Sequence, residues 1–472
     1  MPMWACDFSD CKKPAVRNHG DCILCNRHLC AKHLQPTFHK CPEWQDADNY
    51  DPAARAAEAD ELTGLIKRID TIALAARASY LRDGIPCSVP PLHHGRANRS
   101  SVMGGMNYHV TICFNDGVEW IARVRRFNAT SPPPVLRDYI VQSEVATLKF
   151  LEHTAVPAPK VFDFALEGAD NPVGVGYILM EKLPGKSLRW DHTVTQEQKT
   201  RMMGQLAEIF IELKKYPFDS LGSLVNPDRP RVGAFARESL TDFEQSTMRT
   251  MGPLSSWEEY HESSLRMILD LIVRGELFSQ QAVDAYLIHR FLMDLVPSVL
   301  SKSAQDDQKY YLKHADDKGD HLLVDGDFNI TGIIDWEWAH TAPPSHAFNS
   351  PIGLLPVGEF YRGINDLGKD ETTFARFLEG KGHSDLAHSV LNGRLQHRFN
   401  FCCGYDLADW KGFLGLFQGL RDVVKVDNGI DWDDWKYAAL RRYSDDDGLQ
   451  LLLDRHGSLE VPSLSTPDHP TH

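Results

Sequence analysis

The sequence has no apolar stretch long enough to cross a membrane and carries a deficit of positive charge. No stretch reaches the roughly 18 apolar residues of a membrane-spanning helix, and the N-terminus lacks the apolar core of a signal peptide. The 50 Lys and Arg against 65 Asp and Glu leave a net charge of −15. This balance disfavours non-specific nucleic-acid binding, which depends on a basic face that neutralises phosphates. We expect a protein of the cytosol or the nucleus with no membrane partner.

Cysteine is scarce beyond the first 41 residues. Six of the ten cysteines lie within that short segment. In a reducing compartment such clustering predicts metal ligands before disulfides. The remaining chain is long enough, at 472 residues with 42% hydrophobic residues, to bury a sizeable core in two or three domains.

Eight side chains of the N-terminal segment have the spacing of two zinc sites. They are Cys6, Cys11, Cys22, Cys25, Cys30, His33, His39 and Cys41. Zinc takes thiolate and imidazole ligands in fours, and closed sites of this kind are structural. Because so short a segment cannot bury enough apolar surface to fold alone, metal would supply its stability. Six basic residues against four acidic ones disfavour DNA binding, and a contact with a protein partner is the role we expect.

The same spacing resembles the AN-one-type zinc finger, which binds two zinc ions in a cross-braced way. The resemblance implies one set made of Cys6, Cys11, Cys30 and His33. It implies a second set made of Cys22, Cys25, His39 and Cys41. Four residues separate the first two cysteines, where two are commoner in that family.

Periodicity predicts the elements that follow. Polar residues 45–52 predict a linker, and apolar residues at three- and four-residue steps predict one amphipathic helix over 53–81. The buried stripe of this helix would be Leu62, Leu65, Ile66, Ile69, Ile72, Ala73, Ala76 and Tyr80. Strands are predicted at 108–114, 120–124, 161–166 and 177–181, with a helix at 135–152. Helices should dominate after 187, interrupted by one strand-like region at 310–336, and the tail 457–472 should be disordered.

Two aspartates in the second half of the chain suit phosphoryl transfer. Asp316 lies in the loop His-Ala-Asp, and Asp335 directly follows the apolar run 330–334. The reaction needs one carboxylate to orient the acceptor hydroxyl and take its proton, and a second to hold Mg²⁺ on the nucleotide phosphates. We assign the first task to Asp316 and the second to Asp335.

These motifs resemble the aminoglycoside phosphotransferase family, whose fold is that of protein kinases. The likeness covers roughly residues 101–435 and is strongest in the segment ITGIIDWEWA. It implies an α+β, bilobal, protein-kinase-like fold preceded by the finger. The expected units are the finger at 1–45, a linker and helix at 46–97, a small lobe at 98–185 and a mostly helical large lobe at 186–456. The implied activity is ATP-dependent transfer of phosphate to a hydroxyl of a small molecule, with Mg²⁺ or Mn²⁺.

The resemblance also implies the residues that bind the nucleotide. They are Gly104, Gly105 and Asn107 in the phosphate loop, Arg123 and Glu144 on a strand and the next helix, Glu181 and Leu183 in the hinge, and His321 in the catalytic loop. Arg123 replaces the family's strand lysine, although Arg125 would share its face of the strand. His321 replaces an asparagine that reaches a metal ion, and imidazole suits Mg²⁺ poorly.

These two departures favour an alternative. The chain could be a catalytically weak or inactive kinase-like scaffold that binds a protein partner through its finger. The sequence does not identify the acceptor.

Overall fold

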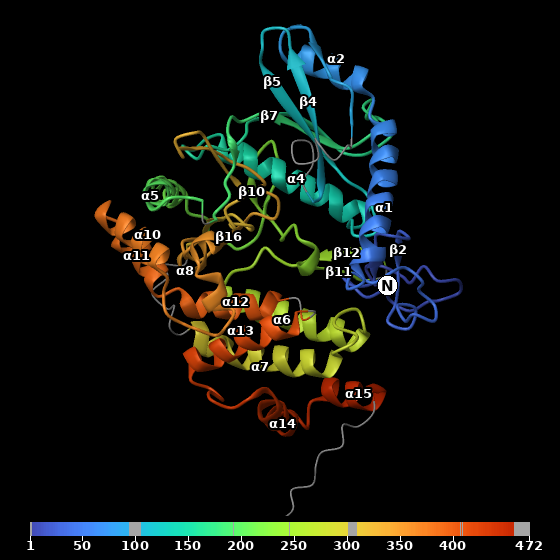
Figure 1. Cartoon of the computed structure of the whole chain (residues 1–472), viewed down its shortest axis with the longest axis vertical. Coiled ribbons are helices and arrows are strands. Elements are labelled where there is room, and N and C mark those ends of the chain that lie inside the picture. Colours follow the sequence, from blue (N-terminus) through green and yellow to red (C-terminus); the bar gives the residue numbers. More distant parts are fainter. Residues whose placement is uncertain are drawn as a thin grey trace, which may run out of the picture.

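The computed structural model describes residues 2–93, 105–191, 193–244, 246–300, 309–405, 407 and 409–456. Gly104 and the tail 457–472 therefore lie outside the described residues. Within them the chain mixes helices and sheet. One antiparallel sheet lies at one end of the molecule and a block of helices at the other (Figure 1).

The main sheet has five strands in the order β3-β4-β5-β7-β6. Its strands are β3 (Cys87–Ser88), β4 (Asn107–Phe114), β5 (Glu119–Arg125), β6 (Val161–Ala165) and β7 (Tyr177–Glu181). Helix α4 (Pro134–Leu151) connects β5 to β6 and lies under the sheet (Figure 1). The four predicted longer strands and the helix between them are confirmed to within a residue or two. Strand β4 alternates between buried and partly buried residues, β7 is a short buried apolar run, and the buried residues of α4 recur at three and four positions.

The predicted single helix over 53–81 is wrong in two respects. The segment forms α1 (Ala47–Arg68) and α2 (Thr71–Leu81), so α1 begins inside the predicted linker. Asp70 separates the helices because its side chain accepts hydrogen bonds from the backbone of Ile72 and Ala73 and so begins a new helix. The new helix direction turns the predicted stripe outward after the break, which leaves Ile72 82% exposed.

Short strands form the connection between sheet and helices. Strand β14 (Leu322–Val324) pairs with β15 (Ile330–Ile333) and with β8 (Lys186–Ser187), and β13 (Tyr311–Lys313) pairs with β16 (His340–Ala342). Gly185 precedes β8 at a φ of +109°, and a Cβ there would lie 2.4 Å from Thr331 Oγ1. Only glycine allows this close approach.

The prediction of one strand-like region after residue 187 was incomplete. Two further hairpins occur: β9 (Leu224–Val225) with β10 (Arg231–Val232), and β11 (Thr241–Glu244) with β12 (Thr247–Thr250). Strands of two to four residues are too short to show a period of two.

Helices make up the rest of the molecule. They are α5 (Gln196–Leu213), α6 (Trp257–Arg274), α7 (Ala282–Leu300), α8 (Pro344–Ala347), α9 (Val357–Phe360), α10 (Lys369–Gly380), α11 (Ser384–Leu391), α12 (Arg394–Gly404), α13 (Trp410–Val424), α14 (Trp432–Arg442) and α15 (Asp447–His456). One apolar core joins α4, α5, α10 and α11 to the short strands, and a second fills the space between α6, α7 and α12 to α15.

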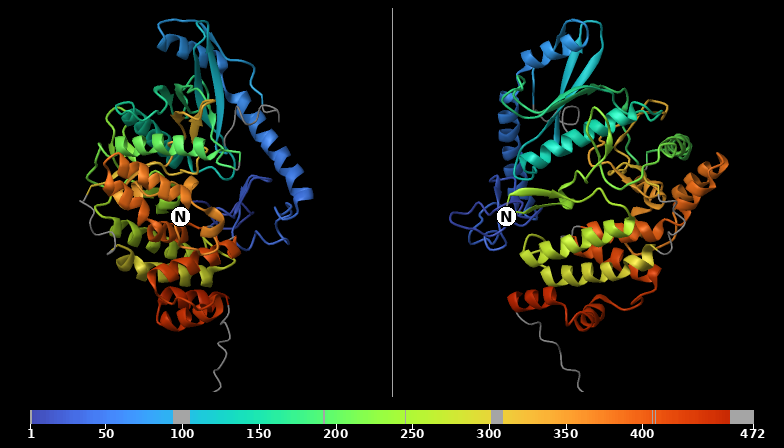
Figure 2. Two further views of the ribbon diagram at one scale, coloured as in Figure 1. Left: turned by 60° about the vertical axis from the view of Figure 1, so that its left-hand side comes forward. Right: turned by 180° about the vertical axis from the view of Figure 1, so that it is seen from behind.

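The N-terminal Cys/His module (residues 2–41) contains the hairpin β1 (Asp21–Cys22) and β2 (Arg27–His28). It lies beside one end of α1 and the hairpin β11–β12 (Figures 1 and 2). Direct bonds hold it there, because His28 Nε2 lies 2.8 Å from the carbonyl oxygen of Ala129 and the Arg17 N–H donates to the carbonyl of Glu276.

Candidate active site

Three charged residues from distant parts of the chain meet under the sheet. Arg123 on β5 forms an ion pair with Glu144 on α4, and its Nη2 lies 2.5 Å from a carboxylate oxygen of Asp335, which follows β15. Arg123 and Glu144 are both buried, with 8% and 5% of their side chains exposed, whereas Asp335 is 54% exposed. The structure thus brings together a buried cation, a buried carboxylate paired with it and an exposed carboxylate.

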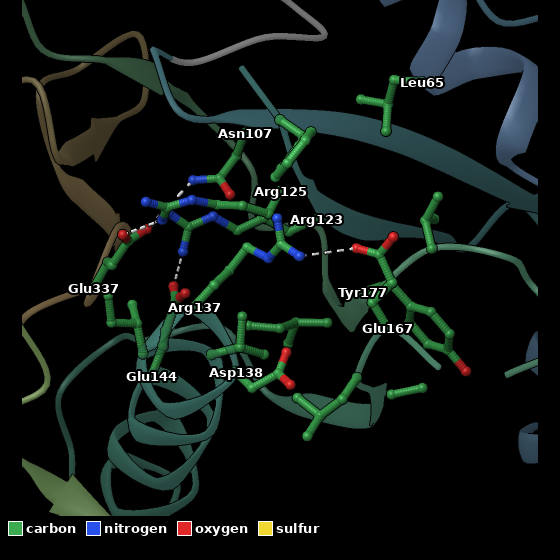
Figure 3. Close-up of a pocket in the computed structure, with 18 of the residues that line it drawn as sticks. Leu65, Asn107, Arg123, Arg125, Arg137, Asp138, Glu144, Glu167, Tyr177 and Glu337 are labelled. Carbon is green, nitrogen blue, oxygen red and sulfur yellow. Dashed lines mark hydrogen bonds and ion pairs between the residues drawn. The ribbon is translucent and has the colours of Figure 1, made fainter. Parts of the chain in front are cut away.

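A fourth charged residue of this cluster, Glu337, had no predicted role. Its side chain is 3% exposed and contacts Arg123 at 3.1 Å as well as Arg125 (Figure 3). With its amide oxygen toward Arg123, Asn107 on β4 accepts hydrogen bonds from Nε at 3.1 Å and Nη2 at 2.6 Å. The sequence already contained a sign that Glu337 belongs to the site. It is an acidic residue two positions after Asp335 within a run of aromatic residues, which is not the usual setting of an exposed surface charge.

Asp335 occupies the left-handed region of the backbone, at a φ of +65°. Aspartate tolerates this region better than most residues, and such conformations persist where the surrounding structure holds them. Although burial opposes ionisation, the guanidinium of Arg123 holds the pKa of Asp335 below its usual range. Asp335 is therefore a carboxylate at neutral pH, as a ligand for a hard cation must be.

Asp316 lies in the loop after β13, about two-thirds buried and 3.1 Å from Lys318 Nζ. The backbone N–H of Asp316 donates to Nδ1 of His314 at 3.2 Å, so His314 carries its proton on Nε2 and donates it to the carbonyl of Ile334 at 3.0 Å. His314 therefore connects the Asp316 loop to the backbone beside Asp335. These bonds make His314 a brace for the loop and leave it no free lone pair with which to act as a base.

His321 is buried and stacks against His314 with 4.3 Å between ring centroids. Burial and the neighbouring His314 lower its pKa to about 3, so the ring is neutral at physiological pH. The backbone N–H of Gly319 donates to Nδ1 at 3.3 Å, which places the ring proton on Nε2. In this tautomer His321 offers no lone pair to a cation.

The predicted hinge follows β7, where Glu181 pairs with Trp120 of β5. The backbone N–H of Glu181 donates to the carbonyl of Lys160, whereas no hydrogen bond within the described residues engages the N–H of Leu183. The side chain of Leu183 packs on Gly332, where a Cβ would lie 2.5 Å from it. Among the described residues, the backbone N–H of Leu183 is thus left without a partner. Of the predicted phosphate loop, the structure describes Gly105, which is exposed, and Asn107, which is buried at the start of β4.

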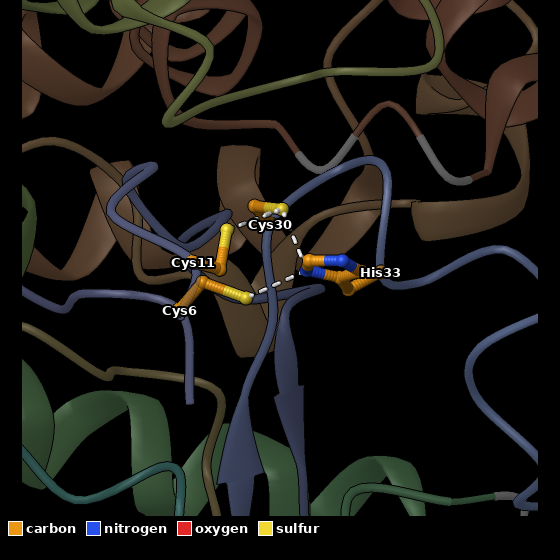
Figure 4. Close-up of side chains that lie close together, drawn as sticks. All are labelled: Cys6, Cys11, Cys30 and His33. Carbon is orange, nitrogen blue, oxygen red and sulfur yellow. Dashed lines mark hydrogen bonds between the residues drawn. The ribbon is translucent and has the colours of Figure 1, made fainter. Parts of the chain in front are cut away.

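Two sets of four side chains in the N-terminal module could each hold a metal ion. One is Cys6, Cys11, Cys30 and His33 (Figure 4), and the other is Cys22, Cys25, His39 and Cys41. In each set the four donor atoms lie within 4.8 Å of one another. These are the two predicted sets. Their thiolate and imidazole donors match the preferences of zinc, and every ligand position is taken by the protein.

A profile of the phosphotransferase enzyme family matches residues 107–349, just over half of the chain. The chain belongs to this family. The matched residues run from Asn107 on β4 to Asn349 and include Arg123, Glu144, Asp316 and Asp335.

Among curated proteins, a subtelomeric hrmA-associated cluster protein of Aspergillus fumigatus is 37% identical over 172 residues, covering 35% of this chain and 31% of that protein. The clavilactone A biosynthesis cluster protein Y of Ampulloclitocybe clavipes is 27% identical over 248 residues, covering 51% of this chain and 56% of that protein. The chain thus spans about a third to about half the length of these relatives.

Among solved structures, a thermostable mutant of the aminoglycoside phosphotransferase APH(4)-Ia is 15% identical, with a TM-score of 0.39 over 76% of this chain and all of that one. A fructosamine-3-kinase homologue from Thermobifida fusca is 16% identical, with a TM-score of 0.43, and the match covers 74% of this chain and 98% of that one. In the described part of the chain, no helix has the length and apolarity needed to cross a membrane.

Proposed function

We propose that the chain is an ATP-dependent kinase that transfers phosphate to a hydroxyl of a small molecule. The observation that carries this proposal is the meeting of Arg123, Glu144 and Asp335, which come from a strand, a helix and a loop far apart in sequence. Membership of the phosphotransferase family supports it. The proposal includes the two lobes expected from the sequence, a small lobe at 98–185 and a large lobe at 186–456.

The residues take the following roles in the proposal. Arg123, oriented by Glu144, binds nucleotide phosphates, and the free N–H of Leu183 together with the backbone near Glu181 binds the adenine. Asp316 orients the acceptor hydroxyl and accepts its proton. Asp335 would hold Mg²⁺ or Mn²⁺, which supplies charge neutralisation on the phosphates when bound. Its open, ionised carboxylate fits a hard cation, whereas the neutral His321 does not.

Zinc is proposed as a structural metal of the N-terminal module. Eight donors in two closed sets of four leave no open ligand position, so these metals would stabilise the module and take no part in the reaction.

One observation favours the scaffold alternative. The guanidinium of Arg123 is shared among Glu144, Asp335 and Glu337, so nucleotide phosphates and a cation must compete with existing ion pairs. A chain held in this arrangement would bind Mg²⁺-ATP weakly or not at all.

The experiment measures turnover of ATP by the purified, zinc-loaded chain against a panel of small hydroxyl and amine compounds. Binding of Mg²⁺-AMP-PNP is followed in parallel by thermal shift. Asp327→Ala is the matched control for both aspartates, because Asp327 is an exposed carboxylate in the nearby turn between β14 and β15. If no nucleotide binding is detected under these conditions, the proposal of a kinase fails and the alternative of an inactive scaffold takes its place.

A further inference from the structure

Strand β4 directs alternate side chains to the two faces of the main sheet. Tyr108, Val110 and Ile112 are fully buried in the apolar core that the sheet shares with α1 and α2. Because successive residues of a strand point to opposite faces, the side chains between them lie on the other face. His109 is one of these, and no role has been assigned to it so far.

Two observations place His109 beside the charge cluster. Asn107, two positions earlier on the same face of β4, accepts hydrogen bonds from the guanidinium of Arg123. His109 itself pairs with Arg123 across β4 and β5, and the Cβ atoms of residues paired in this way lie about 5 Å apart. His109 therefore adjoins the cation that is proposed to bind the nucleotide phosphates.

The register of the strands orders this face from the hinge to the phosphates. Thr111 on β4 pairs with Ile121 on β5, and Ile121 pairs with Met180 on β7, next to the predicted hinge. His109 lies two residues further along β4, about 7 Å from Thr111 and opposite Arg123. A nucleotide that extends from the hinge to Arg123 would bring its phosphates beside His109, and its adenine beside Ile121.

The imidazole ring of His109 has no hydrogen-bond partner among the described residues, and the residue is partly exposed. Burial and the positive charge of Arg123 lower the pKa of His109 to about 4, although Asp335 opposes this shift. The ring is therefore neutral at physiological pH and carries one N–H donor and one acceptor nitrogen. A phosphate oxygen between the two side chains could accept hydrogen bonds from both His109 and Arg123.

We propose that His109 is a nucleotide-binding residue that donates its ring N–H to a phosphate oxygen of ATP beside Arg123. The proposal rests on the proposed kinase function and adds a binding residue to the same site. A hydrogen bond to an ionised oxygen is about twice as strong as one between neutral groups. Because this bond requires a phosphate, His109 favours the nucleotide over the nucleoside.

The test compares Mg²⁺-AMP-PNP with adenosine, which has the same base and sugar but no phosphate. Binding of each probe to the full, zinc-loaded chain is measured by NMR titration, and the ratio of the two affinities is the readout. His109→Leu should lower this ratio about tenfold, which corresponds to about 1.4 kcal/mol. His109→Asn and His109→Gln place an amide N–H near the position of Nδ1 or Nε2, so one of them should restore the ratio to within about threefold of the parent.

Thr111→Val is the matched control, because Thr111 lies on the same face of β4 but nearer the hinge. It should leave the ratio at the parental value. A parental ratio in His109→Leu, including an equal loss of both probes, would overturn the proposal, and so would a failure of both amide variants to restore the ratio. If the parent chain does not bind Mg²⁺-AMP-PNP, the kinase function fails and His109 loses its role with it. If the parent binds the nucleotide and His109→Leu keeps the parental ratio, only the role of His109 fails.

Discussion

Glu337→Gln tests the charge cluster under the sheet. The carboxylate is 3% exposed and contacts Arg123 and Arg125, and the substitution preserves its shape while removing its charge. Breaking a buried ion pair from one side costs about 3–5 kcal/mol, because the partner charge stays buried. Glutamine retains one acceptor oxygen and Arg123 keeps Glu144, so we expect the lower end of that range, about 3 kcal/mol.

The matched control is Glu167→Gln. Glu167 also contacts two arginines, Arg68 and Arg137, but its side chain is 38% exposed. Exposed pairs contribute about 0–1 kcal/mol, so this variant should unfold almost as the parent does.

Urea unfolding followed by tryptophan fluorescence measures the difference. With a slope of about 2–3 kcal/mol per molar urea, a loss of 3 kcal/mol lowers the midpoint by about 1 M. If Glu337→Gln lowers the midpoint no more than Glu167→Gln, the buried cluster does not contribute as argued and the importance of Glu337 is refuted.

Three further outcomes are expected. The purified chain should hold two zinc ions, and chelation should unfold residues 2–41 while the helical body stays folded, as measured by metal analysis and hydrogen exchange. Asp316→Ala should abolish phosphotransfer with little loss of ATP affinity, whereas Asp335→Ala should weaken metal-nucleotide binding, as measured by turnover and titration. His321→Asn should preserve or raise activity with Mg²⁺ and reduce any preference for Mn²⁺, because amide oxygen suits Mg²⁺ better than imidazole does.

Each of these predictions would be contradicted by a specific result. One zinc ion or none, after purification without chelator, contradicts the double site. Near-parental turnover in Asp316→Ala would mean that its loop does not orient the acceptor. The control Asp327→Ala measures the effect of removing a carboxylate from a loop outside the proposed site. Loss of activity in His321→Asn with both metals would mean that the histidine itself takes part in the proposed reaction.

Local periodicity was sufficient where an element is long and one of its faces is buried. The strand β4 and the helix α4 are as predicted for this reason, whereas β7 shows itself as a short apolar run because four of its five residues are buried. It was insufficient at Asp70, where a single capping side chain interrupts a continuous apolar pattern and redirects the helix. It was also insufficient for β9 to β12, whose pairs are too short to carry a period.

Spacing along the chain predicted the grouping of the eight Cys and His ligands, because the ligand chemistry of a short segment is largely set by which residues it contains and how far apart they are. Motif order likewise predicted Arg123, Glu144, Asp316 and Asp335. Only the tertiary structure decided that Glu337 joins Arg123 and Arg125, that His321 carries its proton on Nε2, and that Arg17 fixes the module against Glu276, 259 positions away. The physical reason is that burial and charge pairing depend on distances between segments remote in sequence, which no local pattern encodes.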